Sequence, residues 1–159
     1  MTFFTAQFFI QLTTSFIATI AFAILLRISR KHLLHVGVCG TITFAIYYTL
    51  YFFTSSLFVA AFGSAMVTSI CAEILARLRH APTIVFVLTG IVPTVPGGAL
   101  YRAMRDLLLQ KGAEALKNFT ETLEVGIGIA GGIVTVPIIL GIIIDARAAR
   151  KKKKADKQS

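Results

Sequence analysis

Four long apolar stretches constrain the fold of this chain more than any other feature. They cover residues 3–26, 33–53, 55–76 and 122–144, and a helix of about 20 residues is enough to cross a bilayer. In lipid, every backbone polar group must be satisfied within the protein, which favours helices. The chain is 56% hydrophobic and 14% charged, whereas soluble domains are about 45–50% apolar and about 25% charged. We therefore predict an all-α integral membrane protein.

A shorter apolar segment between the third and last stretches is interrupted. Residues 83–92 reach only about 15 Å at 1.5 Å per residue, roughly half of the hydrocarbon core. The following residues, 93–98, read Pro-Thr-Val-Pro-Gly-Gly. The prolines disrupt the preceding turn, and the glycines allow backbone angles closed to other residues and a close approach. We interpret this break as a candidate site, since lipid tolerates it only where it is buried in protein or faces water; the alternative is a loop at the membrane edge.

After the break, apolar residues recur at helical spacing opposite charged ones, which predicts an amphipathic helix to about Phe119. The predicted fold has about five transmembrane helices, of which the fourth is interrupted at Pro-Gly-Gly and followed by this amphipathic helix. Small residues in the third stretch, and the GxxxG spacing of Gly128 and Gly132, predict close helix packing. We expect residues 1–146 to form a single transmembrane domain and residues 147–159 a basic, disordered cytoplasmic tail.

Positive charge predicts the orientation of the chain. The turns at residues 27–31 and 77–80 and the C-terminal tail are net basic, whereas the N-terminus and the turn at 53–56 carry no charged side chain. With five crossings, the positive-inside rule places the N-terminus outside and the C-terminus in the cytoplasm, and we expect the plasma membrane as the location. The basic tail explains much of the net charge of +9, so we predict a lipid bilayer and no nucleic acid as partner.

The helix that follows the break is a candidate binding site for an anionic group. Transporters bind such groups at the N-termini of interrupted helices, where unwound carbonyls and hydroxyls complete the site. Arg102 lies one turn into this helix, where a positive charge interacts unfavourably with the helix dipole, by about 0.3–1 kcal/mol. A negative partner is therefore favoured. That partner is either Asp106, one turn further on, or a substrate carboxylate, which we favour because the glycines add access to the backbone. The candidate substrate-binding residues are Pro93, Thr94, Pro96, Gly97, Gly98 and Arg102.

Glu73 is an acid well inside an otherwise apolar stretch. An ionisable residue in a membrane span indicates a functional site, so Glu73 is a candidate for binding the driving ion. The alternative is an i,i+4 ion pair with Arg77 near the membrane surface. Glu73 and Asp106 together are the candidate ion-coupling residues.

Catalytic and metal-binding patterns are absent from the sequence. It contains no HExxH motif, no P-loop and no evident histidine–carboxylate partner for a serine or threonine. Cys39 and Cys71 lie in apolar stretches without CxxC spacing, as expected of small buried residues. We therefore predict that the protein is not an enzyme and uses neither a metal nor a cofactor.

A set of neighbouring motifs resembles a known transporter family. Glu-Ile-Leu-Ala-Arg at residues 73–77, Ala-Pro at 81–82, Ile-Val-Pro-Thr-Val-Pro-Gly-Gly at 91–98 and Tyr-Arg-Ala-Met at 101–104 look like the pattern of the threonine/serine exporter family in its short-subunit form. The resemblance spans about residues 57–144. The positions that it marks as functional are Glu73, Pro93, Pro96, Gly97, Gly98 and Arg102.

The resemblance implies a helical membrane exporter of small amino acids or related carboxylates that is driven by an ion gradient. Full-length members hold two such halves in one chain, whereas this chain resembles only the second half, which implies a companion five-span subunit. We therefore predict one subunit of a heteromeric, secondary-active exporter (an antiporter) of threonine, serine or related carboxylates. The alternative is a small pore-forming or scaffolding membrane protein, which would not need a buried acid beside a helix N-terminus.

Overall fold

The computed structural model describes residues 6–155, with side chains for residues 7–146. Every regular element in this range is a helix: α1 (Ala6–Leu25), α2 (Arg30–Thr54), α3 (Leu57–Arg79), α4 (Thr83–Ile91), the short 3-10 helix η1 (Val92–Thr94), α5 (Gly97–Leu108) and α6 (Gly112–Ala155). Within the described range, α1, α2, α3 and α6 are long and apolar enough to cross a membrane, and α4 with α5 makes a fifth span if the bent pair is counted as one. The predicted all-helical membrane protein is confirmed.

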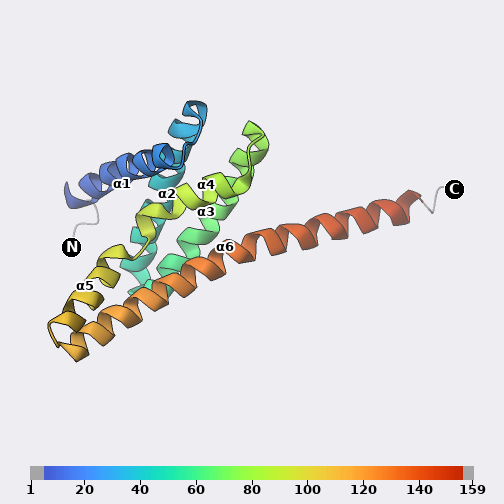
Figure 1. The fold of residues 1–159 in the computed structure, drawn as a ribbon. Helices are drawn as coiled ribbons and strands as arrows, with labels where there is room; N and C mark the ends of the chain where they lie inside the picture. Colours follow the sequence, from blue (N-terminus) through green and yellow to red (C-terminus); the bar gives the residue numbers. More distant parts are fainter. Residues whose placement is uncertain (1–5, 156–159) are drawn as a thin grey trace.

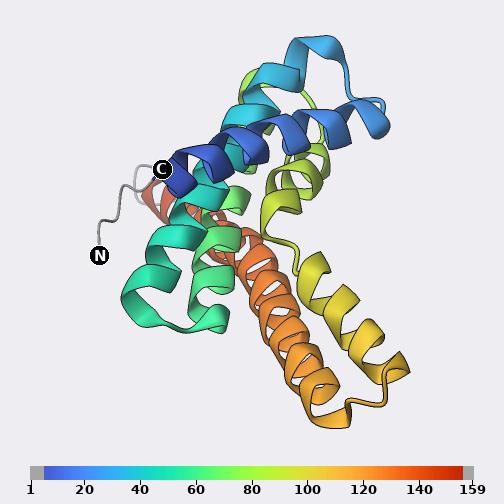
Figure 2. The same ribbon diagram turned by 90° about the vertical axis from the view of Figure 1, so that its left-hand side faces the viewer.

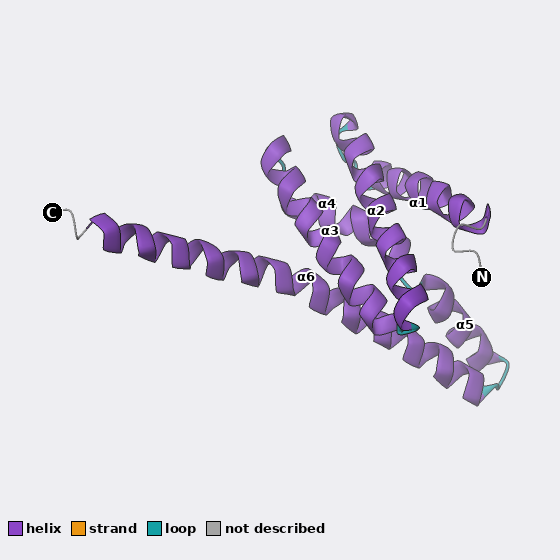
Figure 3. Cartoon of the chain, turned by 180° about the vertical axis from the view of Figure 1, so that it is seen from behind, coloured by secondary structure: helices purple, strands orange, loops and turns teal. Residues whose placement is uncertain are grey.

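Helix α3 lies at the centre of the structure and packs against α2, α4 and α6 (Figure 1). Helix α1 packs against α2, and α4 contacts both α2 and α3. Helix α5 packs mainly against α6, and the two form a hairpin that extends away from the other helices (Figure 2). The view from behind shows that α6 also continues well beyond the other helices in the opposite direction (Figure 3). The hairpin is therefore attached to the rest of the protein chiefly through the contact of α6 with α3.

Small and hydroxyl-bearing side chains make up much of the interior of the α1–α4 part, together with a few larger apolar ones. Phe86 is the largest fully buried side chain in the described range, and the others are Val36, Thr19, Thr43, Thr68, Thr89 and Ser64. The four threonine hydroxyls donate to the carbonyl four residues earlier, which satisfies them within their own helix. The hydroxyl oxygens of Thr43 and Thr68 also lie 2.6 Å apart and join α2 to α3. Such a core allows close helix approach without large apolar side chains.

Two glycines of α6 lie directly against the backbone of α3. A Cβ atom at Gly128 would lie 2.9 Å from the carbonyl oxygen of Phe58, and one at Gly132 would lie 2.5 Å from that of Phe62. On the α3 side the predicted small-residue face is buried; its members are Ala61, Ala65, Thr68, Ser69, Ala72 and Ala76. The close packing predicted from the GxxxG spacing is confirmed.

The amphipathic helix is shorter than predicted. The expected continuation to about Phe119 is wrong, because α5 ends at Leu108 and α6 begins at Gly112. Gln110 adopts a left-handed conformation with φ 58°, and the N–H groups of Gln110 and Lys111 donate to the carbonyls of Leu107 (3.1 Å) and Asp106 (2.9 Å). This is the bonding pattern of a Schellman cap, in which glycine is usual at the left-handed position. Here glutamine occupies that position instead. The apolar periodicity therefore continues through the turn, and no glycine in the sequence indicates the end of α5.

Helix α6 is longer than the last predicted span. It contains residues 122–144, and the tail predicted to be disordered is described as helix as far as Ala155. Residues 147–155 consist of alanine, lysine and arginine, which are strong helix formers. Residues 156–159 lie outside the described range, and the division into a membrane domain and a cytoplasmic tail at residue 146 stays a prediction.

The α3–α6 contact predicts that Gly132→Ala destabilises the protein. The added Cβ would lie 2.5 Å from a backbone oxygen and 2.6 Å from the Cβ of Ala65, so it can be accommodated only if the two helices separate. Overpacking of this kind costs about 1–3 kcal/mol. Gly126→Ala is the matched control in the same helix, since a Cβ there would meet no atom within 4 Å. Thermal unfolding in detergent should show a lower Tm for Gly132→Ala alone; equal Tm values for the two variants would contradict the contact.

Candidate functional site

The break between α4 and α5 is a tight, bent connection. Helix α4 ends at Ile91, η1 follows, and α5 begins at Gly97 with its axis bent by 55° from the preceding segment. Pro93 lies inside η1, and Pro96 directly precedes α5. Thr94 is only 4% exposed, and its hydroxyl donates to the carbonyl of Ile91 at 2.8 Å. Because η1 packs against α1 and α2, the break is covered by protein on that side.

The two glycines at the start of α5 are exposed. Their predicted role in adopting backbone angles closed to other residues is wrong, because no described glycine has a positive φ. A Cβ at Gly97 would meet no atom within 4 Å, and one at Gly98 would meet only Nη1 of Arg102, at 3.5 Å. No side chain caps the N-terminus of α5. Neither conformation nor packing therefore requires glycine at position 97, and the first turn of α5 is open to close approach.

The side chain of Arg102 lies along the start of α5 toward α6. It is exposed, its Nη1 lies 3.5 Å from the position that a Cβ at Gly98 would take, and its Nε donates to Oδ1 of Asn118 at 3.4 Å. Pairing with Asp106, the alternative that the sequence left open, is wrong, because Asp106 bonds to other groups. Among the described residues no ion pair is found for Arg102.

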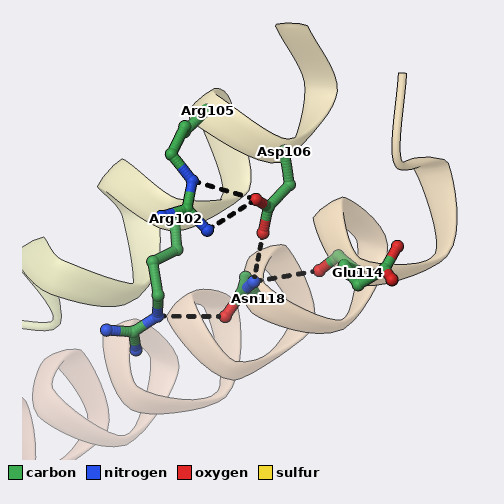
Figure 4. A network of polar contacts seen from close by, with 5 residues as sticks. All are labelled: Arg102, Arg105, Asp106, Glu114 and Asn118. Atoms are coloured by element: carbon green, nitrogen blue, oxygen red, sulfur yellow. Dashed lines mark hydrogen bonds and ion pairs between the residues drawn. The ribbon is translucent and has the colours of Figure 1, made fainter. Parts of the chain in front are cut away.

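Asp106 is the centre of a polar network between α5 and α6 (Figure 4). It is only 3% exposed. Its Oδ1 accepts hydrogen bonds from Nη2 (2.8 Å) and Nε (3.1 Å) of Arg105, and its Oδ2 accepts one from Nδ2 of Asn118 (3.0 Å). The same amide nitrogen donates to the backbone oxygen of Glu114 at 3.0 Å. Burial of a carboxylate is tolerated when it is paired and hydrogen-bonded, as here.

Asn118 was not predicted as a site residue. It lies in the region expected to be one continuous amphipathic helix, where it could not have faced Asp106. The contact arises because the turn at residues 109–111 folds α6 back along α5, which brings the two side chains together. An amide in an amphipathic stretch gives no signal of such a contact.

Glu73 lies in a different part of the structure. Its Oε2 is 3.6 Å from Nε of Arg77, and its side chain is 25% exposed. It lines a groove of about 160 Å³ between α3 and α6, together with Leu140 and three other residues. Leu140 and Asn118 are on the order of 30 Å apart along α6 at 1.5 Å per residue. The structure therefore places Glu73 and the Arg102–Asp106 cluster in two separate regions, at different heights on α6.

Two further polar contacts mark opposite ends of the bundle. Oε1 of Glu124 accepts a hydrogen bond from the backbone N–H of Phe58 at 3.2 Å, so this acid of α6 caps the N-terminus of α3. At the other end, Arg79 contacts Nε2 of His35. That contact brings the two basic turns, before α2 and after α3, to the same end of the bundle (Figure 1).

Polytopic membrane transporters are built from membrane-length helices, with a bent, interrupted segment and ionisable side chains between helices. The described part of this chain has these features. The sequence matches the family described as Threonine/Serine exporter, ThrE, over residues 11–139. Because the match covers most of the chain, the protein belongs to this family, as the motifs predicted. The match begins within α1, so it also includes the helices before residue 57. No curated protein and no solved structure gives a significant match.

Proposed function

We propose that this protein is one subunit of a secondary-active exporter of threonine, serine or related small carboxylates. The observation that carries the proposal is that Arg102, which has no ion-pair partner among the described residues, lies beside the open first turn of α5. A cation beside the exposed glycines at a helix N-terminus, where the helix dipole is positive, is suited to a carboxylate. Membership of the exporter family supports transport as the activity.

In this proposal, the break from Pro93 to Gly98 interrupts a membrane span. Helix α4 alone is about 14 Å long at 1.5 Å per residue, too short for the hydrocarbon core, whereas α4, η1 and α5 together are long enough. The carboxylate docks at Gly97, Gly98 and Arg102, and the two prolines keep the first turn of α5 free of the preceding helix. Thr94 is buried and already bonded within its turn, so it supports the break rather than contacting the substrate.

A companion subunit completes the transporter in this proposal. Secondary transporters with inverted repeats bind their substrates near the interface of two oppositely oriented halves. Five spans in one chain give termini on opposite sides of the membrane, which is the arrangement of one such half. The resemblance to the second half of longer family members supports a five-span partner that supplies the first half.

The orientation in the proposal has the N-terminus outside and the C-terminus in the cytoplasm of a cell with this protein in its plasma membrane. The contact of Arg79 with His35 supports it, because it groups both basic turns at one end, which the positive-inside rule assigns to the cytoplasm. The turn between α5 and α6 is then outside.

Cysteine labelling tests this orientation. In a background with Cys39 and Cys71 replaced by alanine, an impermeant maleimide added to intact cells should label Gly112→Cys. Arg30→Cys should react only after the membrane is permeabilised, because it lies in a basic turn. Labelling of position 30 but not of position 112 in intact cells would reverse the proposed orientation.

Arg102→Gln is expected to weaken substrate binding by the assembled transporter. A charge-assisted hydrogen bond contributes about 1.5–3 kcal/mol, so the half-saturating concentration of threonine should rise about tenfold to a hundredfold. The measurement is threonine and serine flux in liposomes that contain this chain with its companion. Lys111→Gln removes one positive charge from the same hairpin and should leave the flux unchanged.

Two comparisons complete that experiment. Gly97→Val should also impair flux by blocking approach to the backbone, whereas Gly112→Val is the matched control; each glycine begins a helix and a Cβ at either would meet no atom within 4 Å. This chain alone should give no substrate-specific flux. If Arg102→Gln transports normally, the substrate-binding site lies elsewhere. Unselective leakage through liposomes that contain this chain alone would support the pore-forming alternative.

Glu73 is proposed to bind and release the driving proton. Its ion pair with the exposed Arg77 is worth only about 0–1 kcal/mol, so the pair does not explain an acid between α3 and α6. Glu73→Gln should abolish gradient-driven export, while detergent-solubilised complexes keep their normal assembly. Arg77→Gln breaks the same ion pair but keeps the carboxylate, so it should retain coupling. Equal loss in the two variants would assign Glu73 to the ion pair alone.

A further inference from the structure

We infer that Asp106 and Asn118 are positioning residues that hold the Arg102 guanidinium ready for one carboxylate. The inference rests on the proposed function for the identity of the ligand. Its structural basis is the chain of contacts from Arg105 to Asp106, to Asn118 and to Arg102 (Figure 4).

The orientation of the Asn118 amide is fixed by its hydrogen bonds. An amide nitrogen has two N–H donors, and here both are used: one by Oδ2 of Asp106 and one by the backbone oxygen of Glu114, each at 3.0 Å. Both partners only accept hydrogen bonds. A rotated amide would place its oxygen against two other oxygens, so the nitrogen is fixed toward Asp106 and Oδ1 is fixed toward Arg102.

The terminal nitrogens of Arg102 remain available to a ligand. Oδ1 of Asn118 accepts from Nε, which is one of the five N–H donors of a guanidinium. The four donors on Nη1 and Nη2 are left, and Nη1 lies beside Gly98 at the start of α5. Figure 4 shows both terminal nitrogens pointing away from Asp106. Two parallel N–H groups presented in this way match the geometry of a carboxylate.

The polar network carries a net charge of one positive unit. Arg105 neutralises Asp106 at 2.8 Å, and Asn118 is neutral, so the network leaves a single positive charge, that of Arg102. The carboxylate of Glu114 points away from the network and offers only its backbone oxygen to it (Figure 4). One ligand carboxylate therefore balances the site. An acidic residue at position 118 would occupy Arg102 from within the protein, which explains why an amide rather than an acid suits this position.

The experiment is a double-mutant cycle between positions 118 and 102, read as the half-saturating concentration of threonine for the complete two-subunit transporter. Asn118→Asp should raise this concentration about tenfold or more, because the new carboxylate competes for Arg102 and also replaces the two N–H donors to Asp106 and Glu114 by an acceptor oxygen. Asn118→Ala should raise it about two- to fivefold, because the guanidinium loses its orientation. In the Arg102→Gln background, neither change at position 118 should have a further effect.

The pH dependence separates positioning from a merely structural role. Protonation of the carboxylate introduced by Asn118→Asp restores the single positive charge, so the defect of that variant should shrink as the pH falls. The defect of Asn118→Ala should not. Gln110→Glu adds the same negative charge at the exposed turn of the hairpin and should leave the affinity unchanged. Tm values in detergent identify any variant that fails to fold.

Separate outcomes decide the inference and the proposed function. If Arg102→Gln weakens threonine binding but the position-118 variants bind normally, or their effects add to that of Arg102→Gln, the positioning role is wrong and the binding site stands. If Arg102→Gln itself binds threonine normally, the proposed binding site is wrong. A defect of Asn118→Asp that does not change with pH would also overturn the positioning role.

Discussion

The close contact between α3 and α6 is the interaction on which the rest of the structure depends. Gly128 and Gly132 place the backbone of α6 against that of α3, and α5 is held mainly by α6. Lipid tails are as apolar as leucine, so helix association in a membrane relies on close packing rather than on the hydrophobic effect. If a side chain separated these two helices, the α5–α6 hairpin and its polar network would lose their fixed relation to the other helices.

The same contact relates two acids, Glu73 and Glu124, that lie outside the hairpin network. Glu124, one turn before Gly128 on α6, bonds to the N-terminus of α3, and Glu73 of α3 lines a groove with Leu140 of α6. One acid therefore lies near each end of the α3–α6 contact. A negative charge at a helix N-terminus is favourable, so Glu124 stabilises its end of the contact. Glu73 pairs with the exposed Arg77 of its own helix, so this ion pair contributes less to the stability of the α3–α6 contact.

The proposed site depends on the broken segment and on the hairpin, and a straight span could not form it. Because α5 is bent by 55° from the preceding segment, its first turn is separate from α4. Pro96 has no side-chain oxygen to cap this turn, and the N–H of Gly97 donates to the carbonyl of Val95 within the break. The buried network around Asp106 uses one arginine as a counter-charge and leaves the other available. Burying Asp106 with complete hydrogen bonding avoids a large desolvation cost, and it fixes α5 on α6 at the same time. In the proposed site, the stability of the hairpin and the orientation of Arg102 toward an anion thus have a common origin.

Residue spacing determined the local features of this protein. The length and apolarity of the stretches specified membrane helices, the prolines specified a break before residue 97, and the spacing of Gly128 and Gly132 specified close packing, because each of these depends on neighbours within one or two turns. The family could also be identified from short motifs around Glu73 and Arg102.

Only the tertiary structure decided which polar groups meet. The left-handed Gln110 turns the chain back, and as a result Asp106 of α5 faces Asn118 of α6. Asp106 pairs with its neighbour Arg105, and Arg102 has no carboxylate partner among the described residues. In the same way Glu124 reaches α3, 66 residues earlier in the sequence. The physical reason is that the sequence pattern reports the face of a helix on which a side chain lies, whereas the partner of that side chain depends on how the helices pack.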